Sequence, residues 1–141
     1  MSESLEPFFG YGDGAIHSTQ NLSSAAWAIF FLNDELVSFQ EICIGRSTKN
    51  IAEYSALIEI LFDAISFGIN HIIIRLDSQL VVLKPNSVYT VTNPTLHRLF
   101  LRVRLLERHF DFIQYRNISR NLNTLTDSLA NQVLDRHLQH M

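Results

Sequence analysis

The sequence HIIIRLDSQLVV occupies positions 71–82, and its apolar, β-branched run ends abruptly at the carboxylate of Asp77. A short, nearly unbroken run of Ile and Leu is typical of a strand that is buried on both faces of a sheet. We therefore predict a central strand that ends just before Asp77. Because ligands of open α/β sheets bind beyond the carboxyl ends of such strands, Asp77 is a candidate functional residue. The alternative is that Asp77 only caps the helix that follows it.

Composition limits the possible classes of protein. The chain has 141 residues, of which 47% are hydrophobic, and this is enough for one domain, residues 1–141, with a sizeable core. Its single Cys43 cannot form an internal disulfide, and no Cys or His residues show the spacing of a zinc site. The N-terminus is polar, and no apolar run approaches the roughly 18 residues that cross a bilayer. We therefore expect an intracellular protein without a signal peptide, a transmembrane segment or a membrane partner.

Three extended segments are predicted in the first part of the chain. The segment PFFGYGDGAI, residues 7–16, places Phe9, Tyr11, Asp13 and Ala15 on one side of an extended chain. Apolar runs follow at residues 25–32 and 37–44, and the short connections predict an antiparallel meander. The alternative for Gly-Asp-Gly is a turn, which would explain Asp13 without any function.

An amphipathic helix is predicted over residues 50–67. Its apolar face consists of Leu57, Ile60, Leu61 and Ala64. Glu53 belongs to the same face, whereas Glu59 and Asp63 are predicted to point away from it. Because burying an unpaired carboxylate costs several kcal/mol, Glu53 requires a metal ion, an arginine or a shifted pKa. Alternatively, Glu53 lies in the first turn, where the helix dipole favours acids and solvent reaches the side chain.

The second half of the chain continues with helices and one strand. Gly68 ends the first long helix, and the crossover to the next strand should be right-handed. We predict a short helix after Asp77 that Pro85 stops, a longer one from Pro94 to about His109, a strand over residues 110–115 and a last helix near Thr124. The inner face of the longer helix is predicted to consist of Leu96, Leu99, Phe100, Val103 and Leu106. Thr124 and Asp127 fit a capping box, so a cap alone would also explain Asp127.

Positive charge is concentrated in this second half. The formal net charge of -3, taken alone, argues against a polyanionic partner. However, six of the eleven Lys and Arg residues lie between positions 98 and 120, namely Arg98, Arg102, Arg104, Arg108, Arg116 and Arg120. The arginines of the helix form either a solvated face or a ridge that follows phosphates.

Four carboxylates come from four separate elements: Asp13, Glu53, Asp77 and Asp127. Hard oxygen ligands of this kind hold Mg²⁺, and two ions about 4 Å apart can activate water and stabilise the leaving oxygen of a phosphodiester. Without cations, two carboxylates about 4 Å apart repel by roughly 4 kcal/mol at an effective dielectric constant near 20. A metal site would therefore explain the whole set.

The motifs around these carboxylates resemble those of ribonuclease H. Residues 48–58, TKNIAEYSALI, resemble its N-x-A-E-Y-x-A-L-I signature, and residues 77–82 match its DSQLVV. Residues 120–131 resemble its R-x-x-N-x-A-D-x-L-A-N, and Asp13-Gly14-Ala15 supplies the first element. The archaeal-like domains of plant LTR retrotransposon polyproteins resemble the chain most. This resemblance implies an α/β, RNase H-like fold whose five-stranded mixed sheet has its first three strands antiparallel and its last two parallel to the first, flanked by helices.

The resemblance also implies a function, namely endonucleolytic cleavage of the RNA strand of RNA/DNA hybrids with two Mg²⁺ ions, for which Mn²⁺ is a possible substitute. It implies that the metal ligands and catalytic residues are Asp13, Glu53, Asp77 and Asp127. It further implies that Arg46 and Thr48 bind a phosphate of the DNA strand and that Asn50 and Gln79 contact the minor groove, where 2′-hydroxyls distinguish RNA from DNA. A reverse transcriptase domain is a candidate partner, and we expect a monomer.

Three departures from the family pattern stand out. The N-P-G that follows the first Asp is absent, Thr126 replaces an Ala, and residues 116–124 lack the His of bacterial members. Archaeal-like members often have an Arg in this loop, so the resemblance makes Arg120 the candidate for a supporting role there. One alternative is a domain that has kept only hybrid binding or assembly. The other is a DEDD exonuclease, which would carry Glu at the position of Ala15.

Overall fold

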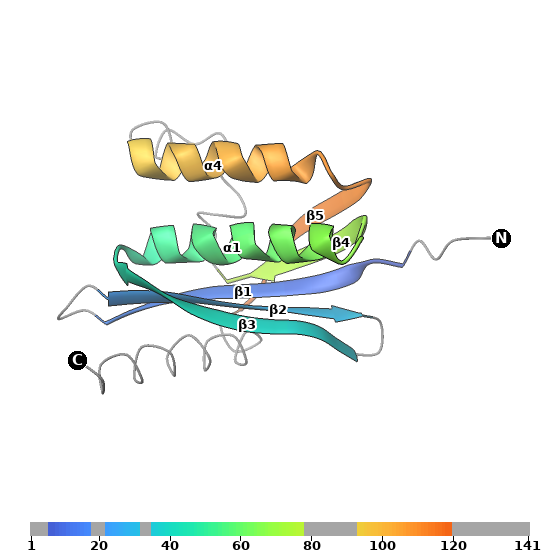
Figure 1. The fold of residues 1–141 in the computed structure, drawn as a ribbon, viewed down its shortest axis with the longest axis horizontal. Helices are drawn as coiled ribbons and strands as arrows, with labels where there is room; N and C mark the ends of the chain where they lie inside the picture. The colour runs from blue at the N-terminus through green and yellow to red at the C-terminus, as the bar shows by residue number, and fades with distance from the viewer. Residues whose placement is uncertain (1–5, 18–21, 32–34, 78–92, 120–141) are drawn as a thin grey trace.

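The structure is a computed structural model that describes residues 6–17, 22–31, 35–77 and 93–119. The strands are β1 (Phe8–His17), β2 (Leu22–Phe31), β3 (Glu35–Arg46), β4 (His71–Leu76) and β5 (Phe112–Asn117), and the helices are α1 (Lys49–Ser66) and α4 (Pro94–Glu107). Within this part, α1 and α4 lie on the same side of one five-stranded sheet (Figure 1). The short helix predicted after Asp77 and the last helix predicted near Thr124 lie outside the described residues.

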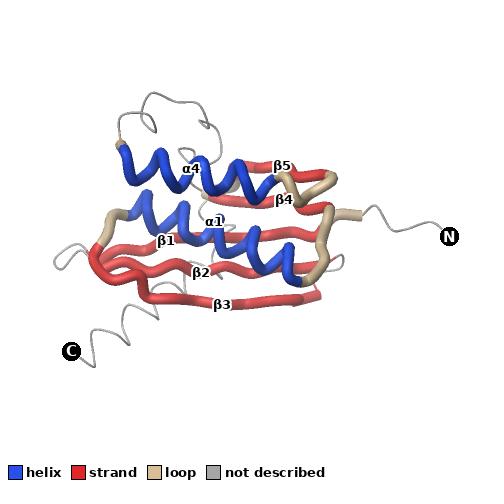
Figure 2. The backbone as a smooth tube through the Cα atoms, turned by 45° about the horizontal axis from the view of Figure 1, so that its top comes forward, coloured by secondary structure: helices blue, strands red, loops and turns tan. Residues whose placement is uncertain are grey.

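The order of the strands across the sheet is β3-β2-β1-β4-β5, as Figure 2 shows. The first three strands are antiparallel, and β4 is parallel to both β1 and β5. This arrangement confirms the predicted α/β fold class and the predicted mixed sheet. Since β1 and β4 lie side by side in the middle and run in the same direction, their carboxyl ends reach the same region of the molecule.

The two neighbouring strands in the middle of the sheet, β4 and β1, form as continuous strands. In β4, Ile72, Ile73 and Ile74 are all buried, which confirms the central strand predicted from the apolar run. β1 pairs with β2 without interruption from Phe9 to His17. The alternative of a turn at Gly-Asp-Gly is therefore wrong, because these residues are part of a continuous strand.

Helix α1 covers the centre of the sheet. Thr48 caps its N-terminus by accepting a hydrogen bond from the backbone N–H of Ile51 at 3.3 Å. The predicted apolar face is confirmed, since Leu57, Ile60, Leu61 and Ala64 are all buried. The core lies between this face and strands β1, β2 and β4. In the described part of the chain, no helix combines the length and the apolar character needed to cross a membrane.

The prediction that Asp63 points away from the packed face of α1 is wrong. Its Oδ2 atom accepts hydrogen bonds from Trp27 Nε1 at 2.7 Å and from Ser38 Oγ at 3.2 Å. Trp27 is 5% exposed, so its indole N–H requires an acceptor within the protein. Asp63 therefore ties α1 to β2 and β3. The helical period could not predict this contact, because both donors come from distant strands.

Helix α4 and strand β5 occur where they were predicted, with shifted boundaries. Asn93 caps α4 by accepting from the N–H of Leu96 at 3.1 Å, and Leu96 and Val103 are buried. The helix ends at Glu107 rather than near His109, because Arg108 and His109 continue as a tighter turn. β5 begins at Phe112 rather than at residue 110. The carbonyl of Asn70 accepts from both residues 111 and 112 and aligns the chain with β4 only there.

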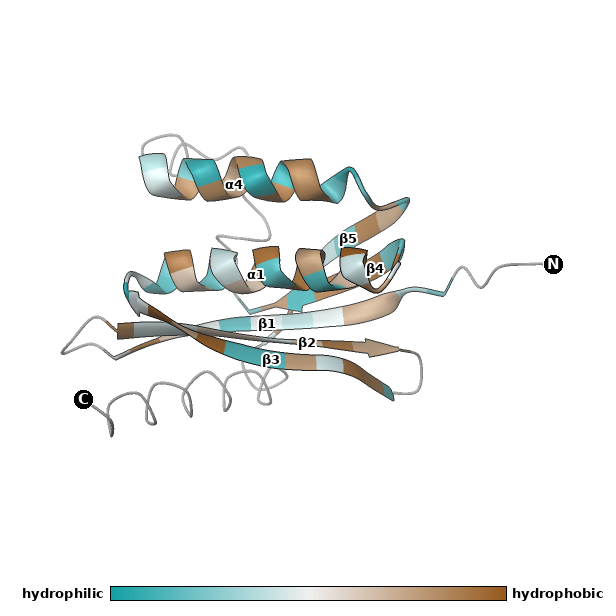
Figure 3. Ribbon diagram, viewed as in Figure 1, coloured by the Kyte–Doolittle hydropathy of each residue, from teal (hydrophilic) through white to brown (hydrophobic). Residues whose placement is uncertain are grey.

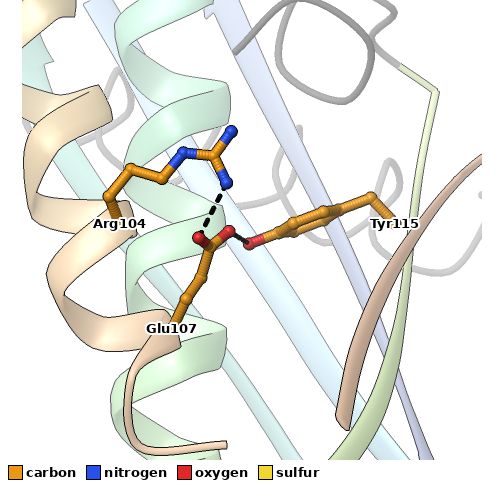
Figure 4. A network of polar contacts seen from close by, with 3 residues as sticks. All are labelled: Arg104, Glu107 and Tyr115. Carbon is orange, nitrogen blue, oxygen red and sulfur yellow. Dashed lines mark hydrogen bonds and ion pairs between the residues drawn. The ribbon is translucent and has the colours of Figure 1, made fainter.

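A polar network joins α4 to β5 (Figure 4). Arg104 Nη1 lies 2.8 Å from Oε1 of Glu107, and the Tyr115 hydroxyl donates to Oε2 of the same carboxylate. Burial raises the pKa of Tyr115, and the neighbouring Glu107 raises it further. The hydroxyl therefore stays protonated and keeps donating. Tyr54 of α1 is 1% exposed, and burial also raises the pKa of its hydroxyl.

Candidate active site

Glycines on β1 allow helix α1 to approach the strand closely. A Cβ atom on Gly14 would lie 2.7 Å from the backbone nitrogen of Glu53, and one on Gly10 would lie 2.8 Å from Cγ2 of Ile60. Real Cβ atoms do not come so near to other heavy atoms, so both positions require glycine in this packing. Asp13 lies between Gly12 and Gly14 and is only 2% exposed. The sequence of β1 thus brings a buried carboxylate next to the beginning of α1.

Glu53 is the carboxylate that α1 contributes. The helix begins at Lys49, and its first turn contains no acidic residue. The alternative in which Glu53 lies in a solvated first turn is therefore wrong. Its side chain is buried, with 7% of the residue exposed. A buried carboxylate at this position needs a polar or cationic environment.

Asp77 follows β4 directly and is the third carboxylate of the candidate site, after Asp13 and Glu53. Gly12 of β1 pairs with Leu76 of β4 in the parallel register, so the next residue on each strand is an aspartate. The Oδ2 atom of Asp77 is buried and accepts no hydrogen bond from the residues that the structure describes. A buried carboxylate oxygen of this kind is available to a ligand. The alternative role of Asp77 as a helix cap concerns residues outside the described part.

The structure thus brings three of the four predicted carboxylates together. One carboxylate oxygen from each of Asp13, Glu53 and Asp77 lies within 4.8 Å of the other two. Two negative charges at such a distance repel by roughly 3 to 4 kcal/mol at an effective dielectric constant near 20. Carboxylate oxygens are the ligands that Mg²⁺ and Ca²⁺ prefer, whereas zinc sites use mostly nitrogen and sulfur. The donor set, its spacing and the available oxygen of Asp77 therefore fit a hard divalent cation.

Comparisons with known proteins give this arrangement a family. A family model described as "Reverse transcriptase-like" matches residues 11–133. Ribonuclease HI of Halobacterium salinarum is 35% identical over 125 residues, which make up 89% of this chain and 63% of that protein. The crystal structure of RNase H1 from the same archaeon has a TM-score of 0.85 at 34% identity and covers 92% of this chain and 98% of that chain. The chain belongs to the ribonuclease H family.

Other ribonuclease H structures share the same fold. LC11-RNase H1 in complex with an RNA/DNA hybrid is 27% identical with a TM-score of 0.84, covering 93% of this chain and 99% of that chain. The N-terminal RNase H domain of a Mycobacterium tuberculosis protein is 28% identical with a TM-score of 0.87, covering 96% and 98%. By sequence, the chain spans 63% of the Halobacterium protein and 25% of the mycobacterial bifunctional protein that it matches. Relatives can therefore contain further sequence.

The residues predicted to bind substrate can be placed in part. Arg46 ends β3 and is exposed, Thr48 is the cap of α1, and Asn50 lies in the first turn of that helix. All three lie close along the chain at the end of α1 that also carries Glu53. The Thr48 hydroxyl accepts from the N–H of Ile51, and a hydroxyl in this role can still donate its own proton to another acceptor. Gln79, Arg120 and Asp127 lie outside the described residues.

Arg75 and Tyr11 were not predicted as site residues. They precede Asp77 and Asp13, respectively, by two positions in the sequence. The two residues are register partners. The Arg75 guanidinium lies 4.4 Å from the centre of the Phe9 ring and 5.5 Å from that of Tyr11, and it donates to the Tyr11 hydroxyl. A cation is thus held against aromatic rings of β1, one strand position of the same face before Asp13. The alternation of Phe9, Tyr11 and Asp13 in the sequence places these three residues on one face of β1. The parallel register, which pairs Tyr11 with Arg75, is also needed to identify Arg75.

Proposed function

We propose that this chain cleaves the RNA strand of RNA/DNA hybrids and that Mg²⁺ is its cofactor. The single observation that supports this most directly is the group of three carboxylates within 4.8 Å of one another at the end of two parallel strands. Membership of the ribonuclease H family and the likeness to a structure with a bound hybrid support the choice of substrate. Residues 1–141 would act as a single ribonuclease H domain.

The proposed roles follow from the positions of the residues. The cations would be held by Asp13, Glu53 and Asp77, together with Asp127 from the undescribed part. Bound cations would offset the repulsion between these carboxylates. When bound, two Mg²⁺ ions supply the charge that activates water and stabilises the leaving oxygen, and Mn²⁺ is a plausible substitute. The chain's own contribution would be to hold Asp13, Glu53 and Asp77 close together and to exclude bulk water from Asp13 and Glu53.

Substrate binding is proposed to involve the beginning of α1. Arg46 and Thr48 would bind a phosphate of the DNA strand, with the arginine able to form a bidentate contact. Asn50 and Gln79 would contact the minor groove, where the 2′-hydroxyls of RNA are accessible. Arg120 would support the loop before the last carboxylate. The relation to plant retrotransposon polyproteins, a reverse transcriptase domain as partner, a monomeric state and an intracellular location remain predictions from the sequence.

A cleavage assay tests the proposal. Uniformly labelled RNA/DNA hybrid, duplex RNA and duplex DNA are each incubated with the protein, with and without Mg²⁺. Internal cuts in the RNA of the hybrid, only with Mg²⁺, are expected. Absence of cuts combined with hybrid binding would favour a domain that has kept binding alone. Trimming from the ends would instead favour an exonuclease.

A further inference from the structure

Helix α4 carries leucines and arginines on the side that faces away from the sheet. Leu101 and Leu105 are 46% and 57% exposed, and Arg98, Arg102 and Arg108, the last being the C-cap of the helix, are exposed as well. Residues three and four positions apart lie on one face of a helix. These five residues therefore form one continuous surface, which we call the α4 strip, and it is roughly 15 Å long at 1.5 Å per residue. Figure 3 shows hydrophobic and hydrophilic bands alternating along this helix.

The strip continues onto the neighbouring helix. Arg102 lies over the ring of Phe62 of α1, with its guanidinium carbon 5.6 Å from the ring centre, and Phe62 is 42% exposed. The two helices lie side by side in both views of the fold (Figures 1 and 2). In the described part of the chain, three of the seven exposed large hydrophobic residues belong to this pair of helices, namely Phe62, Leu101 and Leu105, and a fourth, Phe67, is the C-cap of α1. The exposed apolar residues of α4 are thus linked to that of α1 through Arg102.

The charge around these leucines is positive and only weakly offset. Among the described residues, Arg98, Arg102 and Arg108 form no ion pair, since the pair made by α4 joins Arg104 to Glu107. Burial and the nearby Asp63 raise the pKa of Glu59 of α1, and the positive charge of Arg102 partly opposes this. A complementary surface would therefore be apolar along its middle and acidic along its edges.

We propose that the α4 strip binds an acidic amphipathic helix of a partner protein, an interaction that goes beyond the proposed hydrolysis of hybrids. Leucine-like side chains of the partner would pack on Leu101, Leu105 and Phe62, and flanking Glu or Asp residues would pair with Arg98 and Arg108. Helices are recognised in this way through anchors at i, i+3 and i+7.

Two other occupants fit the strip less well. A nucleic acid would pair with the arginines, but its backbone offers nothing apolar to the half-exposed leucines in the middle of the strip, and the exposed ring at its edge, Phe62, is already covered by the guanidinium of Arg102. A membrane would need a broad apolar face on the helix. The main apolar face of α4, which contains Leu96 and Val103, is already buried in the core.

Binding of a synthetic peptide to the full chain tests the proposal. The probe is a fluorescently labelled helical peptide with leucines at i, i+3 and i+7 flanked by glutamates, and its control has the same composition in scrambled order. We expect the scrambled peptide to bind at least about tenfold more weakly in fluorescence anisotropy, because it cannot present leucines on one face. The double variant Leu101→Ser/Leu105→Ser should weaken binding of the probe by about tenfold or more, since it removes the apolar contact.

A matched control uses a leucine elsewhere. Leu36 is 50% exposed on β3 at the far edge of the sheet, so Leu36→Ser should leave peptide binding unchanged. Hybrid cleavage by Leu101→Ser/Leu105→Ser should proceed at the wild-type rate, which also shows that the variant is folded. Equal binding of both peptides, or peptide binding that the double variant leaves intact, would overturn the proposal.

Two further measurements address the other occupants. The triple variant Arg98→Ser/Arg102→Ser/Arg108→Ser should lose affinity for the probe peptide. If it instead loses affinity for hybrid while keeping affinity for the peptide, the strip follows phosphates and the proposal is wrong. Vesicles of phosphatidylserine and phosphatidylcholine should not bind the protein. Vesicle binding that Leu101→Ser/Leu105→Ser abolishes would assign the strip to a membrane surface instead.

Discussion

Two glutamates on parallel helices, Glu53 of α1 and Glu107 of α4, are both largely buried, yet their surroundings differ. Glu53 is 7% exposed and the side chain of Glu107 is 14% exposed. Glu107 lies against a guanidinium and a hydroxyl donor, Arg104 and Tyr115. Glu53 lies against two other carboxylates, Asp13 and Asp77. The first arrangement neutralises a buried charge, and the second concentrates it.

The difference separates a structural carboxylate from a candidate catalytic one. The network of Glu107 stabilises the packing of α4 on β5 and needs nothing from outside. The cluster around Glu53 brings three carboxylates within 4.8 Å of one another, so a bound cation would lower their mutual repulsion. Burial alone does not distinguish the two glutamates. The sign of the neighbouring charges does.

The largest effect is expected from Asp77→Asn. It should reduce Mg²⁺-dependent cleavage by at least about a thousandfold, because a lost metal ligand removes several kcal/mol of transition-state stabilisation. Hybrid binding should persist. Mg²⁺ should raise the melting temperature of the wild type by binding only the folded state, and this rise should disappear in the variant. Cleavage by Asp77→Asn at the wild-type rate would show that the cluster is not the active site.

A smaller loss is expected from Gly14→Ala. The new Cβ would meet the backbone of Ala52 and Glu53, which cannot rotate away as a side chain can. We expect a destabilisation of about 1 to 3 kcal/mol, and a loss of cleavage near a hundredfold because Glu53 is displaced from Asp13. Gly10→Ala is the matched control, since its Cβ meets the side chain of Ile60. It should cost stability in urea unfolding while largely preserving cleavage. Equal loss of activity in both variants would contradict a specific role for Gly14.

Replacing the structural carboxylate should give the opposite pattern. Glu107→Gln weakens the pair with Arg104 and the hydrogen bond from Tyr115, so we expect a loss of about 1 to 2 kcal/mol in the free energy of unfolding. Cleavage and the Mg²⁺-dependent rise in melting temperature should stay as in the wild type. If Glu107→Gln impaired the response to Mg²⁺, Glu107 would affect the metal site and its role would not be structural alone.

The smallest effect is expected from Glu59→Gln. Burial and the neighbouring Asp63 raise the pKa of Glu59, so its ionised form is less stable in the folded protein than in the unfolded chain. At pH 7 the variant should therefore be more stable by a few tenths of a kcal/mol, with cleavage unchanged. As the pH falls through the raised pKa, the folded wild type takes up its proton first and this advantage disappears. Urea unfolding at pH 7 and at pH 4 measures this difference in stability between the variant and the wild type. A variant that is less stable than the wild type at pH 7 would contradict the raised pKa of Glu59.

Periodicity and motifs predicted most of the fold and three members of the site. The unbroken run of Ile72 to Ile74 indicated the central strand, and the helical period placed Glu53 on the buried face of α1. These predictions succeed because burial imposes a regular pattern on a single element. The register of β1 and β4, which brings Asp13 beside Asp77, was not predicted and comes from the structure alone.

Contacts between elements could not be predicted in the same way. Asp63 binds Trp27 and Ser38, and Glu107 binds Tyr115, although nothing in the local sequence of either carboxylate indicates these partners. The glycines of β1 were interpreted as a possible turn because glycine indicates both turns and close approach. Only the position of α1 shows which of these applies to Gly14.

The spacing of Gly12, Asp13 and Gly14 also restricts how the gene can change in length. Successive residues of a strand face opposite sides, so inserting or deleting one codon within β1 would exchange the positions of glycine and aspartate. One event would then press a side chain into the helix and withdraw a carboxylate from Glu53 and Asp77. Insertions and deletions are therefore tolerable in the connections between strands and incompatible with the interior of β1.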